Sequence, residues 1–368
     1  MPLSQFAPDQ YDILFAEKCS TLRDRFAQVT ALAPACFASA PEGFRMRCEF
    51  RMWHEGDALH YVMFDPKDKK TPVVIESFPI AHQSIQAVMP TLRDMLSKST
   101  ILRHKLFQIE FLASQKGELL ITLIYHRALD EEWQAQAEKV ADDLGVHLIG
   151  RSRKQRIVLT QSHVDETLRV NGREYHYEQP EQAFTQPNSG VNESMIGWAQ
   201  TQADQFGGDL LELYCGIGNF TFPLARCFDR VLATEVSKVA TNAAHNNRER
   251  NQTDNVEFAR LSAEEMSQAL AGAREFRRLS SLHQPLTSLA LNTLLVDPPR
   301  AGLDPQTCTL AQQFERIIYI SCNPTTLLRD LEQLSQSHRC SSWAIFDQFP
   351  YTPHVECGII LQRKARHD

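Results

Sequence analysis

Two residues, Cys322 and Glu356, have the types and settings of a covalent catalytic pair. Cys322 follows an apolar run at 317–321 and precedes an asparagine and a proline that stops a strand. A fixed, partly exposed thiol at a strand end can attack an electrophilic carbon. Glu356 begins the last apolar run, where its carboxylate could remove a proton. His354 is the competing base because its ordinary pKa is nearer neutrality, although a structural or ligand-contacting role suits it better.

A turn that contains two glycines indicates a cofactor site. The apolar run at 209–215 is typical of a buried strand, and Gly216 and Gly218 follow it. Glycines at this spacing let the backbone turn tightly and approach a ligand at a helix N-terminus. Glu235 ends the next apolar run, where an acid can accept hydrogen bonds from both ribose hydroxyls. The third glycine of the dinucleotide fingerprint is absent because position 221 is Thr, which lowers the expectation for NAD.

The block E-L-x-x-G-x-G-x-F, followed by a strand that ends in an acid, resembles the class I S-adenosylmethionine-dependent methyltransferases over roughly residues 185–368. Asp297 heads the sequence Asp-Pro-Pro-Arg, whose prolines end a strand and hold the carboxylate at the sheet edge. Many nucleobase methyltransferases carry this sequence here. It also suits an N-methyltransferase that acts on an exocyclic amine, and in that alternative Cys322 is a bystander.

A cysteine at this edge has a chemical reason if the target is carbon 5 of uracil. That carbon is too weak a nucleophile to take a methyl group from a sulfonium unaided. Addition of a thiolate to carbon 6 makes carbon 5 electron-rich. After the transfer, a general base must remove the carbon 5 proton so that the thiol can leave.

Three further motifs, Asp-Pro-Pro-Arg-x-Gly, Ser-Cys-Asn-Pro and His-x-Glu-Cys-Gly, follow the glycine block in this order and closely resemble the RNA uracil-5-methyltransferase family. The resemblance implies that Cys322 is the nucleophile and that Glu356 removes the carbon 5 proton. It also implies S-adenosylmethionine as the cofactor and S-adenosylhomocysteine as its product, with no metal and no iron–sulfur cluster. The cofactor contacts of the family fall here on Gln186, Tyr214, Asn219, Glu235 and Asp297.

Within the family, the chain resembles the branch that methylates tRNA over nearly its whole length, including the Phe-Thr-Gln-Pro-Asn segment at 184–188. Members that act on ribosomal RNA commonly carry a separate β-barrel or four cysteines for an iron–sulfur cluster. Only Cys19, Cys36 and Cys48 precede position 215 here, and there is no room for a separate barrel. The resemblance implies the T-loop uridine of tRNA as the target, with tRNA-like RNAs such as tmRNA as further substrates. A ribosomal RNA target is the alternative.

Alternating helical and apolar segments after about residue 188 predict a doubly wound α/β sheet of the Rossmann-like kind. Ligands on such a sheet lie beyond the carboxyl ends of the strands. The last predicted strands should return beside the strand at 316–321 and bring Glu356 towards Cys322. Helices are predicted at 192–206 and 219–228, and strands at 209–215, 230–235, 255–261, 291–297, 316–321, 341–349 and 357–364.

The first half of the chain has a different pattern. Alternating apolar residues predict hairpins that turn at 55–57 and at 116–117. A helix is predicted over 131–144, closed by Gly145. We therefore expect a β-rich α+β RNA-binding domain at 1–180 and an S-adenosylmethionine-dependent catalytic domain at 181–368.

Basic residues near the first hairpin are candidates for RNA contacts. Three arginines alternate with apolar residues, which predicts a strand with a largely cationic face, although a solvated strand face is an equally ordinary outcome. A second basic cluster contains an aromatic residue that could stack on an unstacked base. A third lies at 151–156. The candidates are Arg45, Arg47, Arg51, Arg103, Lys105 and Phe107.

The composition limits the class of protein. A chain of 368 residues with 43% hydrophobic and 23% charged residues is typical of a globular protein of two domains. No run is long and apolar enough to span a membrane, and the start lacks the pattern of a signal peptide, so we expect a cytoplasmic monomer. The net charge of -7 confines any RNA contact to a local basic face. A non-catalytic RNA-binding or RNA-folding protein with a vestigial cofactor pocket is the alternative from another class.

Overall fold

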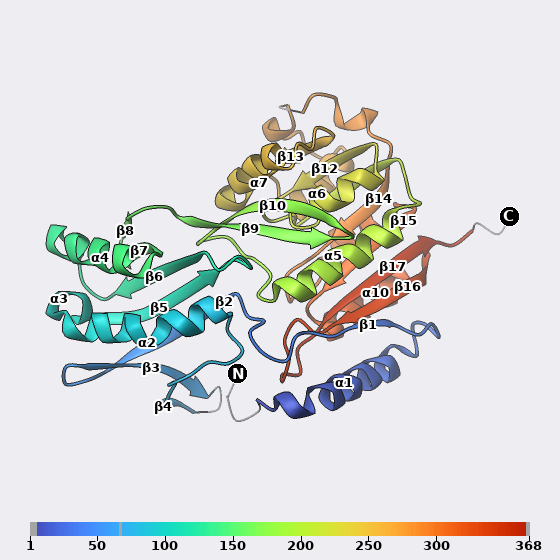
Figure 1. Ribbon diagram of the computed structural model, residues 1–368. Helices are drawn as coiled ribbons and strands as arrows, with labels where there is room; N and C mark the ends of the chain where they lie inside the picture. The colour runs from blue at the N-terminus through green and yellow to red at the C-terminus, as the bar shows by residue number, and fades with distance from the viewer. Residues whose placement is uncertain (1–5, 66–67, 281, 366–368) are drawn as a thin grey trace.

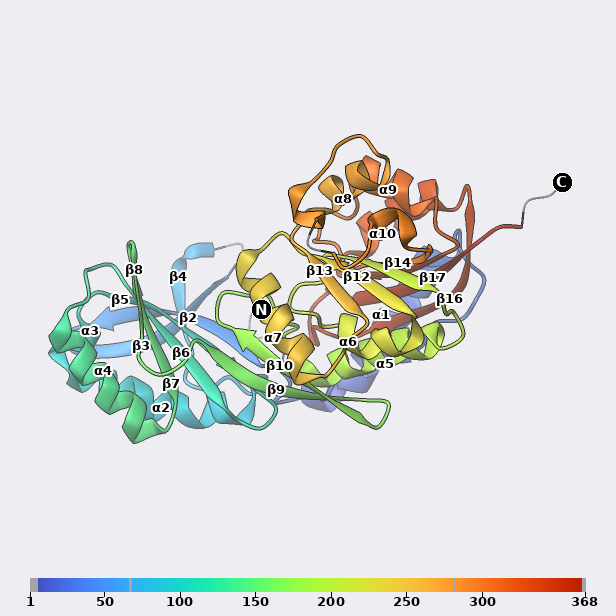
Figure 2. The same ribbon diagram turned by 90° about the horizontal axis from the view of Figure 1, so that it is seen from above.

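The computed structural model of the chain describes residues 6–65, 68–280 and 282–365. Two large sheets lie side by side, and a two-stranded hairpin lies between them (Figure 1). Figure 2 shows the same arrangement from above, with the larger sheet and its helices on one side of the hairpin. Among the described residues, no helix is long and apolar enough to cross a membrane.

The larger sheet has eight strands in the order β1-β16-β17-β15-β14-β11-β12-β13. The five strands from β11 to β15 run parallel to one another, whereas β17 runs antiparallel to both β15 and β16. The predicted doubly wound sheet is confirmed. The strands are β1 (Ala35–Phe37), β11 (Asp209–Leu213), β12 (Arg230–Thr234), β13 (Val256–Ala259), β14 (Leu291–Val296), β15 (Arg316–Ser321), β16 (His338–Phe346) and β17 (Glu356–Arg363).

Helices cover both faces of this sheet, which explains why its central strands are apolar throughout. One face packs against α5 (Ser189–Ala203), α6 (Thr221–Leu224) and α7 (Lys238–Arg250). The other packs against α1 (Tyr11–Phe26), α8 (Ala263–Leu270), α9 (Pro305–Ala311) and α10 (Pro324–Leu334). The helix predicted at 219–228 is shorter than expected, because a single turn of α-helix passes into a 3₁₀ turn at Ala225–Cys227.

The beginning of the chain contributes to the larger sheet, which the sequence did not predict. Strand β1 pairs in parallel with β16, and α1 packs over the same sheet. The assignment of 1–180 and 181–368 to two domains stays a prediction. The structure adds to it that residues 11–37 lie against the sheet formed by the second half.

The smaller sheet has seven strands in the order β4-β3-β2-β5-β6-β7-β8, all antiparallel except the pair β6 and β7. Both predicted hairpins are confirmed, and Gly145 ends α4 in a left-handed conformation, with a φ of 62°. The strands are β2 (Arg47–Glu55), β3 (Ala58–Asp65), β4 (Asp68–Val74), β5 (Leu106–Ala113), β6 (Leu119–Tyr125), β7 (His147–Ser152) and β8 (Gln155–Val158). The helices are α2 (Gln83–Lys98), α3 (Thr100–Arg103) and α4 (Glu131–Leu144).

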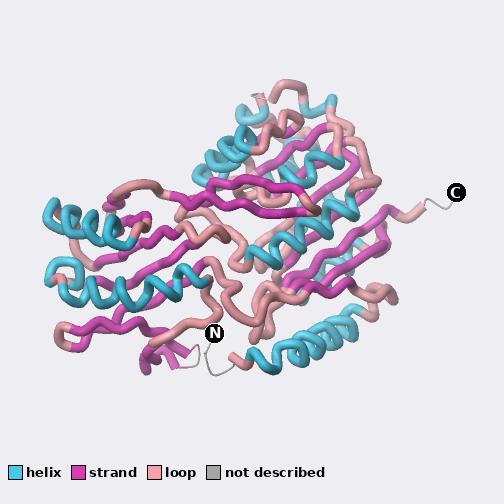
Figure 3. The backbone as a smooth tube through the Cα atoms, in the orientation of Figure 1, coloured by secondary structure: helices cyan, strands magenta, loops and turns pink. Residues whose placement is uncertain are grey.

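The hairpin of β9 (His163–Val170) and β10 (Arg173–Pro180) connects the two sheets. Strand β10 packs on α7, where the side chain of Asn247 accepts a hydrogen bond from the backbone N–H of Glu178 at 2.6 Å. The chain then runs through 181–188 to the start of α5. Figure 3 shows this connection as an irregular stretch between the two bodies of regular structure.

Candidate functional site

A cavity of about 810 Å³ lies between the start of β2 and the carboxyl edge of the parallel strands. Its wall combines parts of the chain that are far apart in sequence: the start of β2, the connection at 182–187, and residues at the ends of β11, β12, β14, β15 and β17. The predicted residues that line it are Arg45, Arg47, Gln186, Tyr214, Gly216, Glu235, Asp297, Cys322 and Glu356. The carboxyl edge is where the sequence placed the chemistry.

Cys322 and Glu356 meet in this cavity because of the register between β15 and β17. Ser321 pairs with Cys357 at the end of that antiparallel ladder, and each predicted catalytic residue lies one position beyond this pair. The Cys322 side chain is partly exposed, whereas Glu356 is 3% exposed. The prediction that the last strands bring Glu356 towards Cys322 is confirmed.

The electrostatics of this pair are dominated by burial and by neighbouring acids. The pKa of the Cys322 thiol is raised to about 11, first by burial and then by the carboxylates of Glu356 and Asp297, while Arg300 opposes the shift. Burial, followed by the charge of Asp297, raises the pKa of Glu356 well above its ordinary value. Glu356 Oε2 is buried and has no hydrogen-bond partner among the described residues. A proton on this carboxyl group is therefore held more firmly than on an exposed one, and the residue lines the cavity.

Asp297 follows β14 in the same wall, and burial raises its pKa to about 7. Arg300, three residues later, also lines the cavity, and it lowers the pKa values of both Cys322 and Glu356. The carbonyl oxygen of Arg300 accepts a hydrogen bond from the side chain of Asn323 at 2.9 Å. This bond ties the loop after β14 to the loop that carries Cys322.

The glycine turn after β11 has the tight backbone that the sequence indicated. Tyr214, Gly216 and Gly218 have φ values of 62°, 57° and 91°. A Cβ atom at Gly218 would lie 2.3 Å from the ring of Phe222, so this position also needs glycine for packing. The Gly216 N–H donates to Glu235 Oε2 at 3.1 Å. Glu235 therefore lies directly beside the turn.

Asn219 and Gln186 complete the wall beside this turn, and both line a small pocket that adjoins the cavity. Asn219 exchanges two side-chain hydrogen bonds with Asn192 of α5, at 2.8 and 2.9 Å. The Oε1 atom of Gln186 is buried and has no partner among the described residues. An unpartnered buried acceptor at the edge of a pocket fits a ligand that brings a hydrogen-bond donor.

One buried acid of this region was not singled out from the sequence. Glu212 in β11 is 1% exposed, and its Oε2 atom has no partner among the described residues. Burial, followed by the charge of Asp297, raises the pKa of Glu212 to about 8. The sequence signal that could have identified Glu212 is its place as the first residue of the E-L-x-x-G-x-G block. Phe349, which also lines the cavity, had no such signal.

His354 is not among the residues that line the cavity. It is exposed, its ring lies 6.2 Å from that of Phe349, and burial lowers its pKa first, followed by the charge of Arg300. The geometry favours Glu356 over His354 as the base. Among the described residues, no group of three or more His, Cys, Asp and Glu side chains could hold a metal ion.

The RNA-contact candidates fall into two groups. Arg45 and Arg47 line the cavity, and Arg47 donates to the carbonyl oxygens of Glu181 and Ala183 at 2.7 and 2.8 Å. The predicted alternation of exposed and buried residues along β2 is present.

The second group lies farther along β2. The guanidinium carbon of Arg51 lies 3.7 Å from the centre of the Phe107 ring, and this ring stacks on His126 with centroids 3.9 Å apart. Lys105 is exposed beside them. Arg103 instead forms an ion pair with Asp57 and donates to the carbonyl oxygen of Ser97. Phe107 is half-buried rather than part of the core.

Comparisons with known proteins agree with one another. The family described as tRNA (Uracil-5-)-methyltransferase matches residues 10–364. The tRNA/tmRNA (uracil-C(5))-methyltransferase of Cellvibrio japonicus is 50% identical over 361 residues, which cover 98% of both chains. The protein of the same name from Dechloromonas aromatica is 52% identical and covers 99% of this chain and 100% of its own.

A solved structure shares the fold. The crystal structure of Pyrococcus abyssi tRNA (uracil-54, C5)-methyltransferase in complex with S-adenosyl-L-homocysteine has a TM-score of 0.70 to this chain. It is 20% identical, and the match covers 94% of this chain and 83% of that one. At this identity the likeness shows the fold alone.

Proposed function

Because the chain belongs to the tRNA (uracil-5-)-methyltransferase family, we propose that it transfers the methyl group of S-adenosylmethionine to carbon 5 of the T-loop uridine of tRNA, giving 5-methyluridine. The target is position 54, and tmRNA is a further substrate, as the names of the similar proteins indicate for those proteins. The observation that carries the proposal is the presence of Cys322, Glu356 and the glycine turn in one cavity.

The first chemical step uses Cys322. Its thiolate adds to carbon 6 of the uracil, and the electrons of the carbon 5–carbon 6 double bond move to make an enolate. S-adenosylmethionine, when bound, supplies an electrophilic methyl group. The raised pKa of Cys322 means that few molecules carry the thiolate at neutral pH unless the charges around it change. The charge of Arg300 favours the thiolate.

The last step uses Glu356. Its carboxylate takes the carbon 5 proton, the double bond forms again, and the bond between carbon 6 and sulfur breaks to release the Cys322 thiolate. The raised pKa means that Glu356 must first lose its own proton, which the charge of Arg300 favours. The carboxylate then holds the carbon 5 proton more firmly than an exposed carboxylate does. The buried Oε2 atom, for which the described residues provide no hydrogen-bond partner, supports this role for Glu356.

The residues around the glycine turn fit the cofactor. The carboxylate of Glu235 already accepts the N–H groups of Gly216 and Ser237, yet each oxygen keeps a lone pair for a ribose hydroxyl. The buried Oε1 atom of Gln186 could accept a hydrogen bond from an amino group. The turn at Gly216 and Gly218 brings the backbone close to the ligand. Tyr214 and Asp297 line both the cavity and the small pocket beside it, Asn219 lines the small pocket, and these three complete the proposed set.

The RNA contacts are proposed on the face formed by β2 and β5. Arg45 and Arg47 lie at the cavity, and Arg51 with Phe107 offers a cation and an aromatic surface farther along β2. Lys105 adds a positive charge beside Phe107. Arg103 is the weakest candidate because Asp57 already neutralises it. The target uridine must be extruded from its stack, and contacts on this face would offset that cost.

The wider assignments follow from the same proposal. The partner is the T arm and T loop of tRNA, and the protein works in the cytoplasm as a monomer. We assign RNA binding to 1–180 and the cofactor chemistry to 181–368, with α1 and β1 packed on the second part.

The test incubates the protein with unmodified tRNA and methyl-labelled S-adenosylmethionine, and then locates the label by digestion of the RNA. We expect label on carbon 5 of the T-loop uridine, lost in Cys322→Ala and kept in Cys36→Ala, which changes an exposed thiol outside the cavity. Label on an exocyclic nitrogen, or full activity without Cys322, would overturn the covalent proposal. Binding of tRNA without any labelling would favour a pure RNA-binding protein, and label on ribosomal RNA alone would reject the tRNA target.

A further inference from the structure

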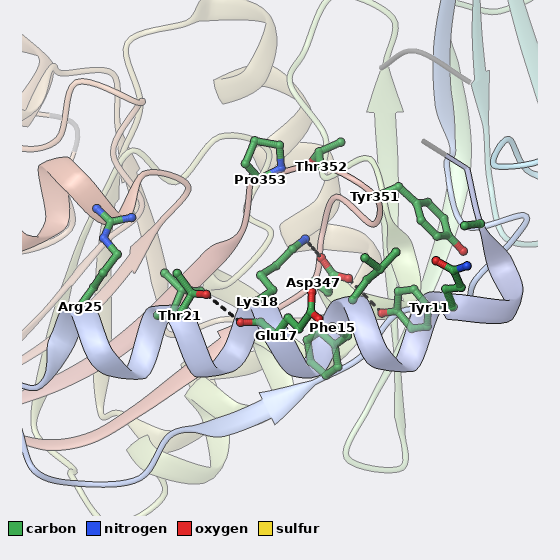
Figure 4. A pocket seen from close by; sticks show the side chains of 14 residues that line it. Tyr11, Phe15, Glu17, Lys18, Thr21, Arg25, Asp347, Tyr351, Thr352 and Pro353 are labelled. Carbon is green, nitrogen blue, oxygen red and sulfur yellow. Dashed lines mark hydrogen bonds and ion pairs between the residues drawn. The ribbon is translucent and has the colours of Figure 1, made fainter. Parts of the chain in front are cut away.

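Lys18 of α1 binds the segment at 347–355, which leads to Glu356. Its Nζ atom lies 2.5 Å from Asp347 Oδ1, and it also donates to the carbonyl oxygens of Phe349 at 3.3 Å and His354 at 3.2 Å. Figure 4 shows Lys18 pointing from the helix towards Asp347. An ammonium group has three N–H donors, and each has an acceptor here.

These three acceptors span the whole connection between β16 and β17. Asp347 directly follows β16, and His354 lies two residues before Glu356, at the start of β17. Phe349, between them, lines the catalytic cavity. Lys18 therefore holds both ends of the segment, and this segment delivers an aromatic ring and the proposed base to the cavity.

Asp347 binds both Lys18 and Tyr11 of α1. Its side chain is 2% exposed, and its second oxygen accepts a hydrogen bond from the Tyr11 hydroxyl at 3.0 Å. That hydroxyl in turn accepts the N–H of Ser39 at 2.6 Å. Asp347 thus stays attached to the beginning of the chain without Lys18. The carbonyl oxygen of Phe349 also accepts the Thr352 hydroxyl at 2.8 Å, but Lys18 links this carbonyl and that of His354 to α1.

We propose that Lys18 is a positioning residue for the final, proton-removing step, and that it acts by holding residues 347–355 so that Glu356 faces carbon 5 of the bound base. This inference rests on the proposed function. A lysine that only neutralised the buried Asp347 would contribute to stability. It would leave the rate of proton removal, relative to the rates of the earlier steps, unchanged.

The two roles separate in a pair of variants. Lys18→Met leaves a buried carboxylate unpaired, so we expect it to lower the melting temperature as well as the rate. Lys18→Met combined with Asp347→Asn removes both charges and keeps an acceptor for Tyr11, so it should regain much of that stability. If Lys18 positions the segment, the double variant still loses about 10- to 100-fold in kcat, with the KM for tRNA changed less than about twofold.

The readout specific to positioning is the covalent intermediate. Slow proton removal leaves the methylated RNA attached to Cys322, so the double variant should accumulate protein–RNA adduct on a denaturing gel at early times. Arg23→Met is the matched control, because Arg23 is an exposed cation of the same helix. A double variant with the stability, kcat and adduct level of the control would overturn the inference.

Chemical rescue offers an independent measurement. Lys18 and Asp347 line a surface pocket of about 720 Å³, through which a small cation can reach the vacated position (Figure 4). Propylammonium replaces the atoms that Lys18→Ala removes, so it should restore kcat and reduce the adduct, whereas the neutral isostere 1-propanol should not. Equal effects of the two would overturn the inference. Absence of uridine carbon 5 labelling by the unaltered protein would instead reject the proposed function.

Discussion

Cys322 and Glu356 stand at the facing ends of two antiparallel strands, each one residue beyond the last pair of the ladder between β15 and β17. A single register thus places the proposed nucleophile beside the proposed base. Because strand positions in a buried sheet are strongly specified, this relationship is more rigid than one between two loop residues. It also explains why the Glu356 carboxylate is among the causes that raise the pKa of the Cys322 thiol.

The first prediction concerns the base. In Glu356→Gln, the amide cannot take the carbon 5 proton, so we expect product release to fall by about 10²- to 10⁴-fold. Methylated RNA should remain attached to Cys322 and appear as a slower band on a denaturing gel. Glu332→Gln is the control, because Glu332 is an exposed glutamate of α10. Normal product formation by the Glu356 variant would assign proton removal to another group.

The second prediction concerns the thiol. With its pKa raised to about 11 by burial and by the charges of Glu356 and Asp297, Cys322 should react slowly with iodoacetamide at pH 7 and faster up to about pH 11. Glu356→Gln removes one of these charges, so the midpoint of the reactivity curve should move to lower pH. Mass spectrometry of the peptide that contains Cys322 follows the reaction, with the exposed Cys36 as the internal reference. An unchanged midpoint would show that the two side chains do not interact.

The third prediction concerns stability and pH. The folded-state pKa of Glu212 is about 8, above its ordinary value of 4.5, so the folded protein holds a proton that the unfolded chain loses between these pH values. This contribution to stability is complete below about pH 4.5 and is lost as the pH rises through 8. The side chain of the Glu212→Gln variant stays neutral. The melting temperature of the variant minus that of the unaltered protein should therefore increase from pH 5 to pH 8.

Thermal unfolding of the cofactor-free protein across this range provides the measurement for Glu212. Glu249→Gln, at an exposed position of α7, should leave the slope unchanged. If the Glu212 variant and the unaltered protein show parallel curves, the carboxyl group is ionised in the folded state.

Local patterns predicted the parts of the site that depend on strand ends. Gly216, Glu235, Asp297 and Cys322 each follow an apolar run, and the carboxyl ends of parallel strands meet at one edge by the geometry of the fold. Glu356 was placed correctly because the last strand of such a sheet returns beside the fifth. Periodicity and topology predicted the strand ends, and the resemblance to the family implied the roles of Cys322 and Glu356.

Long-range contacts account for what the sequence did not reveal. Strand β1 has three residues, too few for a recognisable pattern, and its partner β16 is about three hundred residues away. Arg47 and Arg103 look alike as cations in a sequence, yet one binds backbone carbonyls beside the cavity and the other pairs with Asp57. The partners of a charged side chain depend on tertiary contacts that composition does not encode.

The last prediction concerns the aromatic platform of Phe107, Arg51 and His126. The Arg51 guanidinium and the exposed His126 imidazole both lie against the half-buried ring, so an unstacked base reaches a face of the ring by taking the place of the imidazole. Stacking on an aromatic ring contributes roughly 1–3 kcal/mol per base, so Phe107→Leu should weaken tRNA binding by about 10- to 100-fold.

The control for Phe107 is Phe276→Leu, because Phe276 also lies under an arginine, Arg274, but on a segment outside the cavity and the β2 strand. Filter binding of unmodified tRNA measures the affinity, and methylation at saturating tRNA measures the chemical step. The affinity should fall only in the Phe107 variant, with the saturated rate nearly unchanged, because the ring is not among the residues that line the catalytic cavity. Equal affinities of the two variants would remove Phe107 from the RNA-binding face.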